Sequence, residues 1–205
     1  MSARRQHEKR KSDVRKYIVM RIKAMEMMDL TAVMQSLPDG SLPLPSFPSG
    51  RHGKHIKVSF GTVARSLLAT IIDENGTHAI DIWIDLFPAH RAMIEKAWKR
   101  MEPGWEVLKA FRDSVGFHGD KPNRYFDARH RLAHSPELRI AVDQFERLFK
   151  TLIKMEAAEL PDLEDALDSL LDEQGKRLGS RFDHKVWKAY LMVPDTKSGG
   201  AISGD

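Results

Sequence analysis

The chain has 205 residues, 41% of them apolar and 30% charged, and its formal net charge is +4. This composition is that of an ordinary globular protein and excludes a disordered chain, and no apolar run reaches the roughly 20 residues that span a bilayer. Because the chain has no cysteine, disulfides, thiolate metal sites and cysteine nucleophiles are excluded. The N-terminus also lacks the apolar core of a secretory signal. We therefore expect a cytoplasmic protein with no membrane partner.

Charge is distributed unevenly along the chain. Residues 1–23 hold nine Lys or Arg against two acids, Glu8 and Asp13, which leaves a local charge of +7 (nine minus two). Residues 1–11 are expected to form a flexible basic arm, which is either a solvated terminus or a segment that tracks a phosphate backbone. Residues 155–175 hold eight acids and no Lys or Arg, a pattern typical of the solvated face of a helix.

Apolar residues at helical spacing predict a first helix over about 12–36. The Pro/Gly-rich segment 37–57 then predicts a long loop. A second helix is expected to follow and to close near residues 75–76. Its predicted core face consists of Val63, Leu67 and Ile71.

The segment 80–87 is ambiguous, because it alternates like a strand and also carries a helical stripe. One strand cannot form a sheet, and no other segment is a clear partner, so we predict a helix. A helix over about 89–101 follows. Pro103 is then predicted to occupy the first position of a new helix, because proline is favoured there. The inward face of that helix is expected to carry Trp105, Leu108 and Phe111.

Ser135, Pro136 and Glu137 form a strong helix start, with a hydroxyl N-cap, a proline at the first helical position and an acid in the first turn. The helix that they open has the clearest apolar stripe in the chain and is expected to stop before Pro161. Two more helices are predicted beyond it, the first ending toward Gly175.

The predicted fold class is therefore all-α, in the form of a helical bundle. One domain is expected over 12–192, preceded by the basic arm at 1–11. Residues 193–205 are expected to be a disordered tail, because they are rich in glycine and polar residues.

Arg112 and His118 are the residues that indicate chemistry. On a wheel of about 100° per residue, Arg112 falls about 40° from the centre of its helix's apolar arc, where a charge is costly unless a partner or a bound anion compensates it. A histidine exchanges a proton near neutral pH, and an arginine stabilises charge on a phosphate. The pair would suffice to cleave RNA without a metal, because the ribose 2′-hydroxyl is a positioned nucleophile. Alternatively, Arg112 extends past the core to water or pairs with an acid.

This motif resembles that of HEPN domains. In these small all-α bundles a polar residue directly follows an arginine, and four to six positions lie between the arginine and a histidine. Here it reads Arg112-Asp113, with five intervening residues between Arg112 and His118. The resemblance covers this motif and its helical context, over about 60–160.

The resemblance implies a HEPN-like domain over 12–192 that forms a homodimer, in which two facing motifs make one metal-independent endoribonuclease site. Arg112 and His118 would be catalytic, and Asp113 would orient them. It further implies an RNA substrate, no cofactor or metal, and a role as a toxin or in abortive infection and phage defence. An antitoxin or another regulatory protein is then a possible partner.

Two alternatives use the following segment. Arg129 and His134 also match the spacing of the motif, but His130 follows Arg129 and His134 directly precedes the Ser135 cap, so the first motif is preferred. Asp127, His130 and His134 would share one helix face, which is the spacing of a metal site. Because no HExxH-type base accompanies them and the helix is expected to break at Ser135, we favour a solvated face.

The remaining sequence features indicate binding or no specific chemistry. His52 and His55 lie among basic residues of the 37–57 loop, which would hold an RNA backbone or be only a polar loop. No GxSxG elbow or Walker loop is present, which argues against serine hydrolase and nucleotide hydrolase chemistry. The main non-enzyme hypothesis is an α-helical binding module, in which the face around Trp105 and Phe111 binds a partner or a second copy and Arg112 forms an interface salt bridge.

Overall fold

The computed structural model describes residues 3–38, 41–44, 47–74, 77–115, 122–179 and 182–191. The chain divides into two compact units, Met1–Pro161 and Asp162–Asp205. The predicted all-α class is confirmed, and two short hairpins accompany the helices. The single domain expected over 12–192 stays a prediction. Helix α6 ends at Glu159, before Pro161, and the next helix begins at Leu163.

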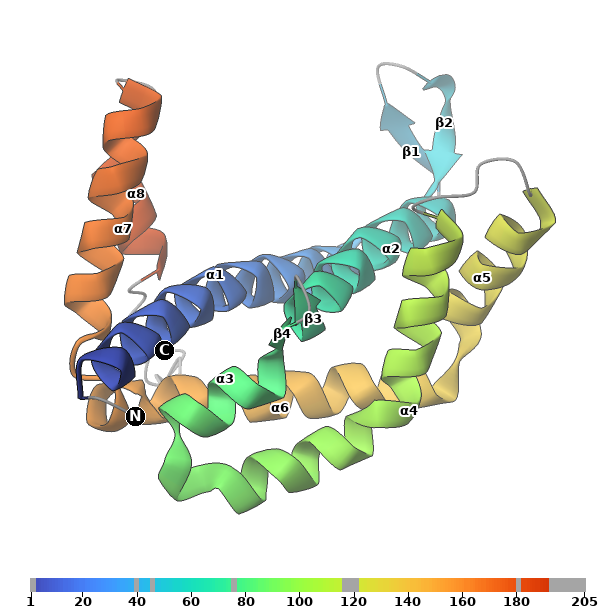
Figure 1. Ribbon diagram of the computed structural model, residues 1–205. Coiled ribbons are helices and arrows are strands. Elements are labelled where there is room, and N and C mark those ends of the chain that lie inside the picture. The colour runs from blue at the N-terminus through green and yellow to red at the C-terminus, as the bar shows by residue number, and fades with distance from the viewer. Residues whose placement is uncertain are drawn as a thin grey trace, which may run out of the picture. The chain divides into compact units, whose positions relative to one another are not determined.

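The described residues of the first unit form six α-helices and two hairpins, and Figure 1 shows their arrangement. The helices are α1 (Ala3–Ser36), α2 (Gly53–Ile72), α3 (Ala79–Leu86), α4 (Arg91–Val115), α5 (Pro122–His134) and α6 (Pro136–Glu159), with a 3₁₀ turn, η1, at Pro88–His90. In the hairpins, β1 (Ser41–Leu44) pairs with β2 (Phe47–His52), and β3 (Asp73–Glu74) pairs with β4 (Thr77–His78), both antiparallel.

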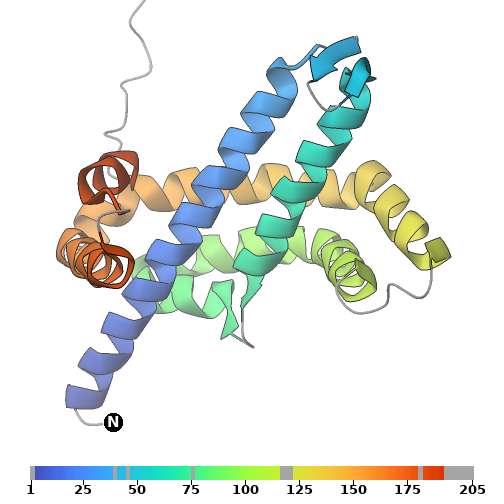
Figure 2. The same ribbon diagram turned by 90° about the horizontal axis from the view of Figure 1, so that it is seen from above.

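The helices of this unit form two layers. Helices α1 and α2 lie side by side as an antiparallel pair and cross over α6 and α3, as both views show (Figures 1 and 2). Helix α4 packs along α6 beneath them and contacts α2 and α5 as well. The core between the layers holds fully buried large side chains from four helices, including Tyr17, Met20, Leu68, Trp83, Phe145 and Phe149.

The buried face of α2 matches the predicted one only in part. Ile71 is buried, as expected, but Val63, also expected in the core, is 51% exposed, and Ala64 and Leu68 are buried instead. The 3.6-residue period was read correctly, but the rotation of the helix is set by its packing on α1, which the sequence of α2 alone does not specify.

Two further expectations need correction. The helix α1 begins at Ala3, so residues 3–11 of the predicted flexible arm are helical. Lys9 pairs there with Asp85, and Nη2 of Arg10 donates to the carbonyl oxygen of Glu159 at 3.0 Å, which ties the helix to the rest of the unit. The predicted 37–57 loop contains the β1–β2 hairpin and the start of α2. The predicted tail, 193–205, lies outside the described residues.

A buried polar cluster joins α1 to α6. The hydroxyl of Tyr17 donates to Oε1 of Glu156 at 2.7 Å, and Nε of Arg21 lies 3.1 Å from the same oxygen. All three side chains are buried. Glu156 belongs to the acidic segment 155–175, so the expected solvated face does not extend to this residue; its carboxylate faces Arg21 of α1 instead.

Helix α4 is continuous, although Pro103 was expected to start a new helix. Figure 1 shows that α4 bends along its length, and an internal proline is the usual cause of such a bend because it removes one backbone hydrogen bond. The neighbouring Gly104 lies against α6: an added Cβ would lie 2.4 Å from Cβ of Ala141 and 2.9 Å from the carbonyl oxygen of Glu137. Close packing on α6 therefore holds the helix together across the proline.

The predicted start of α6 is confirmed. Ser135 is the N-cap, and its hydroxyl accepts a hydrogen bond from the backbone N–H of Leu138 at 3.1 Å. The same hydroxyl donates to Oε2 of Glu137 at 2.8 Å. A backbone hydrogen bond within Glu137 and this hydroxyl lower the pKa of the Glu137 carboxyl.

Ser135→Ala should lower the free energy of unfolding by about 1 kcal/mol, because the cap satisfies a backbone donor that has no partner within the helix. Urea denaturation followed by circular dichroism measures the change. Thr151→Ala is the matched control, because the hydroxyl of Thr151 only bonds back to the carbonyl of Arg147 inside α6. Equal losses in the two variants would contradict a specific capping role.

The second unit pairs α7 (Leu163–Leu178) with α8 (His184–Leu191), as predicted for two further helices. Nζ of Lys188 lies 2.8 Å from Oδ2 of Asp168 and 3.2 Å from Oε1 of Glu164, so part of the acidic segment is paired within the unit. Among the helices that the structure describes, none combines the length and the apolar character needed to cross a membrane.

Candidate functional site

The predicted catalytic segment begins in the last turn of α4. Leu108 and Phe111 are buried, which confirms the predicted apolar face of this helix. Arg112 and Asp113 follow directly in the helix, but their side chains lie outside the described residues, as does the whole of His118. The convergence of Arg112 and His118 therefore stays a prediction.

The alternative motif lies in α5. His134 and His130 are exposed, and their ring centroids are 4.5 Å apart. The side chain of Arg129 is outside the described part of the chain. Within that described part, no three His, Cys, Asp or Glu residues form a group that could hold a metal, so Asp127, His130 and His134 do not converge on a common point. The side chains of the His52 and His55 loop cluster are not described.

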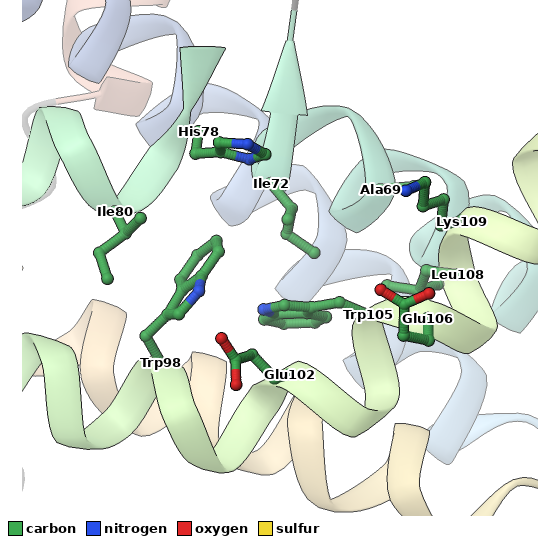
Figure 3. Close-up of a pocket in the computed structure, with 10 residues that line it drawn as sticks. All are labelled: Ala69, Ile72, His78, Ile80, Trp98, Glu102, Trp105, Glu106, Leu108 and Lys109. Atoms are coloured by element: carbon green, nitrogen blue, oxygen red, sulfur yellow. The ribbon is translucent and has the colours of Figure 1, made fainter. Parts of the chain in front are cut away.

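A pocket of about 300 Å³ is lined in part by residues of α4 that precede Arg112, the last of them Lys109. Its apolar walls come from α2, α3 and α4, through Ala69, Ile72, Ile80 and Leu108. Two tryptophans of α4, Trp98 and Trp105, form its aromatic surface (Figure 3). The volume is at the lower end of the range for small-molecule sites.

The helical period explains why α4 supplies so much of this pocket. Trp98, Glu102, Trp105 and Lys109 are separated by four, three and four residues, so they fall on one face of a continuous helix. A helix break at Pro103 would have placed Trp98 and Trp105 on separate elements. The continuity of α4 across Pro103 is thus what assembles the site.

The tryptophans also connect the pocket to the core. The ring centroids of Trp98 and Trp105 are 5.8 Å apart and tilted by 56°, and Trp98 meets Trp83 edge-on at 6.0 Å. Trp83 in turn lies 6.1 Å from Phe145 of α6. Because Trp83 and Phe145 are fully buried, the half-buried Trp98 is held in position from behind.

Charged groups surround the mouth of the pocket. Glu102, Glu106 and Lys109 come from α4 and are exposed, and His78 approaches from the β3–β4 hairpin. Figure 3 shows the carboxylate of Glu102 beside the two tryptophan rings. Two carboxylates against one ammonium give the mouth a negative balance when the histidine is neutral, which favours ligands that donate hydrogen bonds or carry positive charge.

One buried donor in this pocket has no partner. Trp105 is 7% exposed, and among the described residues its indole Nε1–H makes no hydrogen bond. In Figure 3 the nitrogen end of Trp105 is directed toward Trp98 and Glu102, into the pocket. A buried N–H without an acceptor is costly, so this site favours a ligand that supplies an acceptor atom.

A second hollow, of about 340 Å³, lies between α1 and the end of α3. Lys9 pairs there with Asp85, and burial raises the pKa of Asp13, which disfavours the charged form of that carboxyl. We therefore regard the aromatic pocket of α4 as the better candidate site.

Sequence reasoning placed Trp105 on the inward face of a helix and did not identify the pocket. The signal that was available is a carboxylate between two tryptophans at helical spacing, Trp98, Glu102 and Trp105. It was obscured because the expected helix start at Pro103 divides this pattern.

Comparisons of the chain with protein-family models, with curated proteins and with solved structures each find no match. What defines the class of this protein is therefore its own fold and sites: an all-α protein with a small aromatic pocket on α4, the helix that also carries Arg112.

Proposed function

We propose that the protein is a metal-independent endoribonuclease that resembles HEPN domains and acts as a homodimer. The observation that carries the proposal is the position of Arg112, which directly follows the 5%-exposed Phe111 in the last turn of α4 and precedes His118 by six residues. On the helical wheel Arg112 falls about 40° from the centre of the apolar arc, where a charge is costly unless an anion or an acid compensates it, and the scissile phosphate of RNA is such an anion.

In the proposed reaction, the imidazole of His118 takes the proton of the ribose 2′-hydroxyl, and the same histidine of the second subunit, in its protonated form, gives a proton to the leaving 5′-oxygen. The 2′-oxygen attacks phosphorus, the bond to the 5′-oxygen breaks, and the products are a 2′,3′-cyclic phosphate and a 5′-hydroxyl. The guanidinium of Arg112 stabilises the negative charge that develops on the phosphate oxygens. Asp113 would orient the pair, as the resemblance implies.

Positive charge on α1 supports an RNA substrate. Arg4, Arg5, Lys11 and Lys16 are exposed on this helix. Cations in this arrangement neutralise backbone phosphates and make binding strongly dependent on salt. A role as a toxin or in phage defence, with an antitoxin as the restraining partner, is part of the proposal because such proteins share the motif that the chain resembles.

The test is cleavage of single-stranded RNA by the purified full chain in EDTA. Wild type should leave cyclic phosphate ends, and Arg112→Ala and His118→Ala should each lower the rate by about 100-fold or more. His134→Ala is the matched control and should retain the rate. Loss of activity in His134→Ala alone would move the site to Arg129 and His134.

An inactive but folded wild-type dimer would contradict the ribonuclease proposal and favour the second candidate, a non-catalytic α-helical binding module. The aromatic pocket of α4 is the observation that favours this second candidate. In that case Arg112→Ala would change association without any effect on RNA.

A further inference from the structure

We propose that the aromatic pocket of α4 binds an amino-substituted nitrogen heterocycle, the chemical class of adenine and guanine. This ligand is proposed independently of the ribonuclease activity, because it depends on Trp98, Glu102 and Trp105 and on no residue of the Arg/His motif.

The aromatic surface of the pocket favours a flat ligand. Trp98 is half-buried, lines the pocket and is held from behind by Trp83 at 6.0 Å. Trp98 and Trp105 are already in contact at 5.8 Å, so a ligand does not insert between them and instead stacks on one open face. A flat ring is the shape that stacks on an indole, and base–aromatic stacking is a recurrent source of affinity.

The buried indole N–H of Trp105 calls for an acceptor on the ligand. Nε1–H of Trp105 is buried, unpartnered among the described residues and directed into the pocket (Figure 3). An indole nitrogen can only donate, so the ligand must present an acceptor. A quaternary ammonium or a hydrocarbon has none, and either would leave this N–H without a partner.

The two carboxylates of the pocket favour a ligand with hydrogen-bond donors. Glu102 lies beside the tryptophan rings and Glu106 is at the mouth, with Lys109 as the cation of this helix face and His78 on the hairpin. Carboxylates accept hydrogen bonds, and two of them disfavour an anion. The ligand must therefore offer N–H donors next to its acceptor.

An amino-substituted heterocycle meets all three conditions. Guanine, for example, places two N–H donors side by side, which match the two oxygens of a carboxylate, and has a carbonyl acceptor adjacent to them; adenine places an amino group next to a ring nitrogen. A free nucleoside and a base within RNA share this chemistry, and the pocket lies on the same helix as Arg112, with Lys109 one turn before it.

The experiment is a titration followed by the indole N–H resonances of the four tryptophans in a ¹H–¹⁵N spectrum. Trp105→Phe assigns the critical resonance. Guanosine and adenosine should shift it in a saturable manner, and uridine and choline should shift it little. The fully buried Trp83 does not line the pocket, so its indole N–H resonance serves as the internal reference.

Glu102→Gln should weaken guanosine binding by about tenfold, because it replaces a charged acceptor by a neutral one of the same shape. Glu102 is exposed, so this change should leave the fold intact. Glu95→Gln is the matched control: it makes the same change on α4 at an exposed position outside the pocket, and should leave binding unchanged.

Two additional probes identify the source of the ring. Guanosine binding more tightly than guanosine 5′-monophosphate indicates a free nucleoside or base, since the carboxylates repel the phosphate. A guanine-containing tetranucleotide binding more tightly than both indicates a base of RNA. A failure of the ribonuclease assay does not affect any of these measurements.

The proposal is overturned if no nucleoside shifts the Trp105 resonance up to its solubility limit. That result would mean that the N–H is satisfied by the face of the Trp98 ring or by a water molecule. It is also overturned if choline shifts the resonance as strongly as guanosine does, or if guanosine binding is equal in wild type and in Glu102→Gln.

Discussion

Gly104→Ala is expected to lower the free energy of unfolding by about 3 kcal/mol, the upper part of the range for overpacking in a close-packed core. The new Cβ would lie 2.4 Å from Cβ of Ala141 and 2.9 Å from the carbonyl oxygen of Glu137. Neither of these atoms is the end of a flexible side chain, so α4 and α6 must separate. The loss exceeds the gain of about 1 kcal/mol that alanine brings to a helix in place of glycine.

Gly61→Ala is the matched control for this effect. Gly61 is also buried within a helix of the same unit, but there the added Cβ would lie 3.3 Å from Sδ of Met34, a flexible thioether that can move. We expect a change below about 1 kcal/mol. Chemical denaturation monitored by far-UV circular dichroism compares the two variants.

Exchanging the alanine and the glycine tests the contact between positions 104 and 141. Ala141→Gly removes the atom nearest to the new methyl group. The double variant Gly104→Ala/Ala141→Gly should therefore lose less free energy of unfolding than the two single variants together, by about 1 kcal/mol or more. Additive losses would show that the cost of Gly104→Ala arises elsewhere. A Gly104→Ala variant as stable as wild type would contradict the close packing of α4 on α6.

Gly104 also shows where sequence analysis reached its limit. The helix over 80–87, the Ser135 cap and the last two helices were predicted correctly, because their signals are local: an apolar stripe, a hydroxyl cap and a proline at the first helical position. The predicted break at Pro103 was wrong, because the continuity of α4 depends on packing against α6, which is a tertiary contact.

The candidate sites followed the same division. The Arg112/His118 motif was visible in the sequence because it depends on spacing along one segment. The pocket was not, since it needs α2, α3, the β3–β4 hairpin and both halves of α4 together. Val63 illustrates the same limit on a smaller scale: the period of α2 is local, whereas its rotation depends on the neighbouring helix.

Glu156→Leu is expected to lower the free energy of unfolding by about 3–5 kcal/mol, the range found when one partner of a buried ion pair is removed. The change takes away the carboxylate 3.1 Å from Nε of Arg21 and the acceptor of the Tyr17 hydroxyl. The double variant Arg21→Met/Glu156→Leu removes both charges and should recover much of the loss. A double variant no more stable than Glu156→Leu would contradict the ion pair as the cause.

The same carboxyl should give a pH signature. Burial raises the pKa of Glu156 above its ordinary value of 4.5, an effect that the charge of Arg21 and the hydrogen bond from Tyr17 partly offset. The folded state therefore binds this proton more tightly than the unfolded chain, and protonation favours folding. The contribution of Glu156 to stability is complete below the unfolded pKa and is lost as the pH rises through the folded pKa.

Glu156→Gln keeps an acceptor for Tyr17 but has no proton to lose, so it isolates this contribution. Relative to Glu156→Gln, wild type should lose stability as the pH rises above about 4.5. Unfolding curves of both proteins at several pH values between 4 and 7 measure the difference. A wild type that gains stability relative to Glu156→Gln over this range would mean that Arg21 outweighs burial, because the pKa of Glu156 would then lie below its ordinary value.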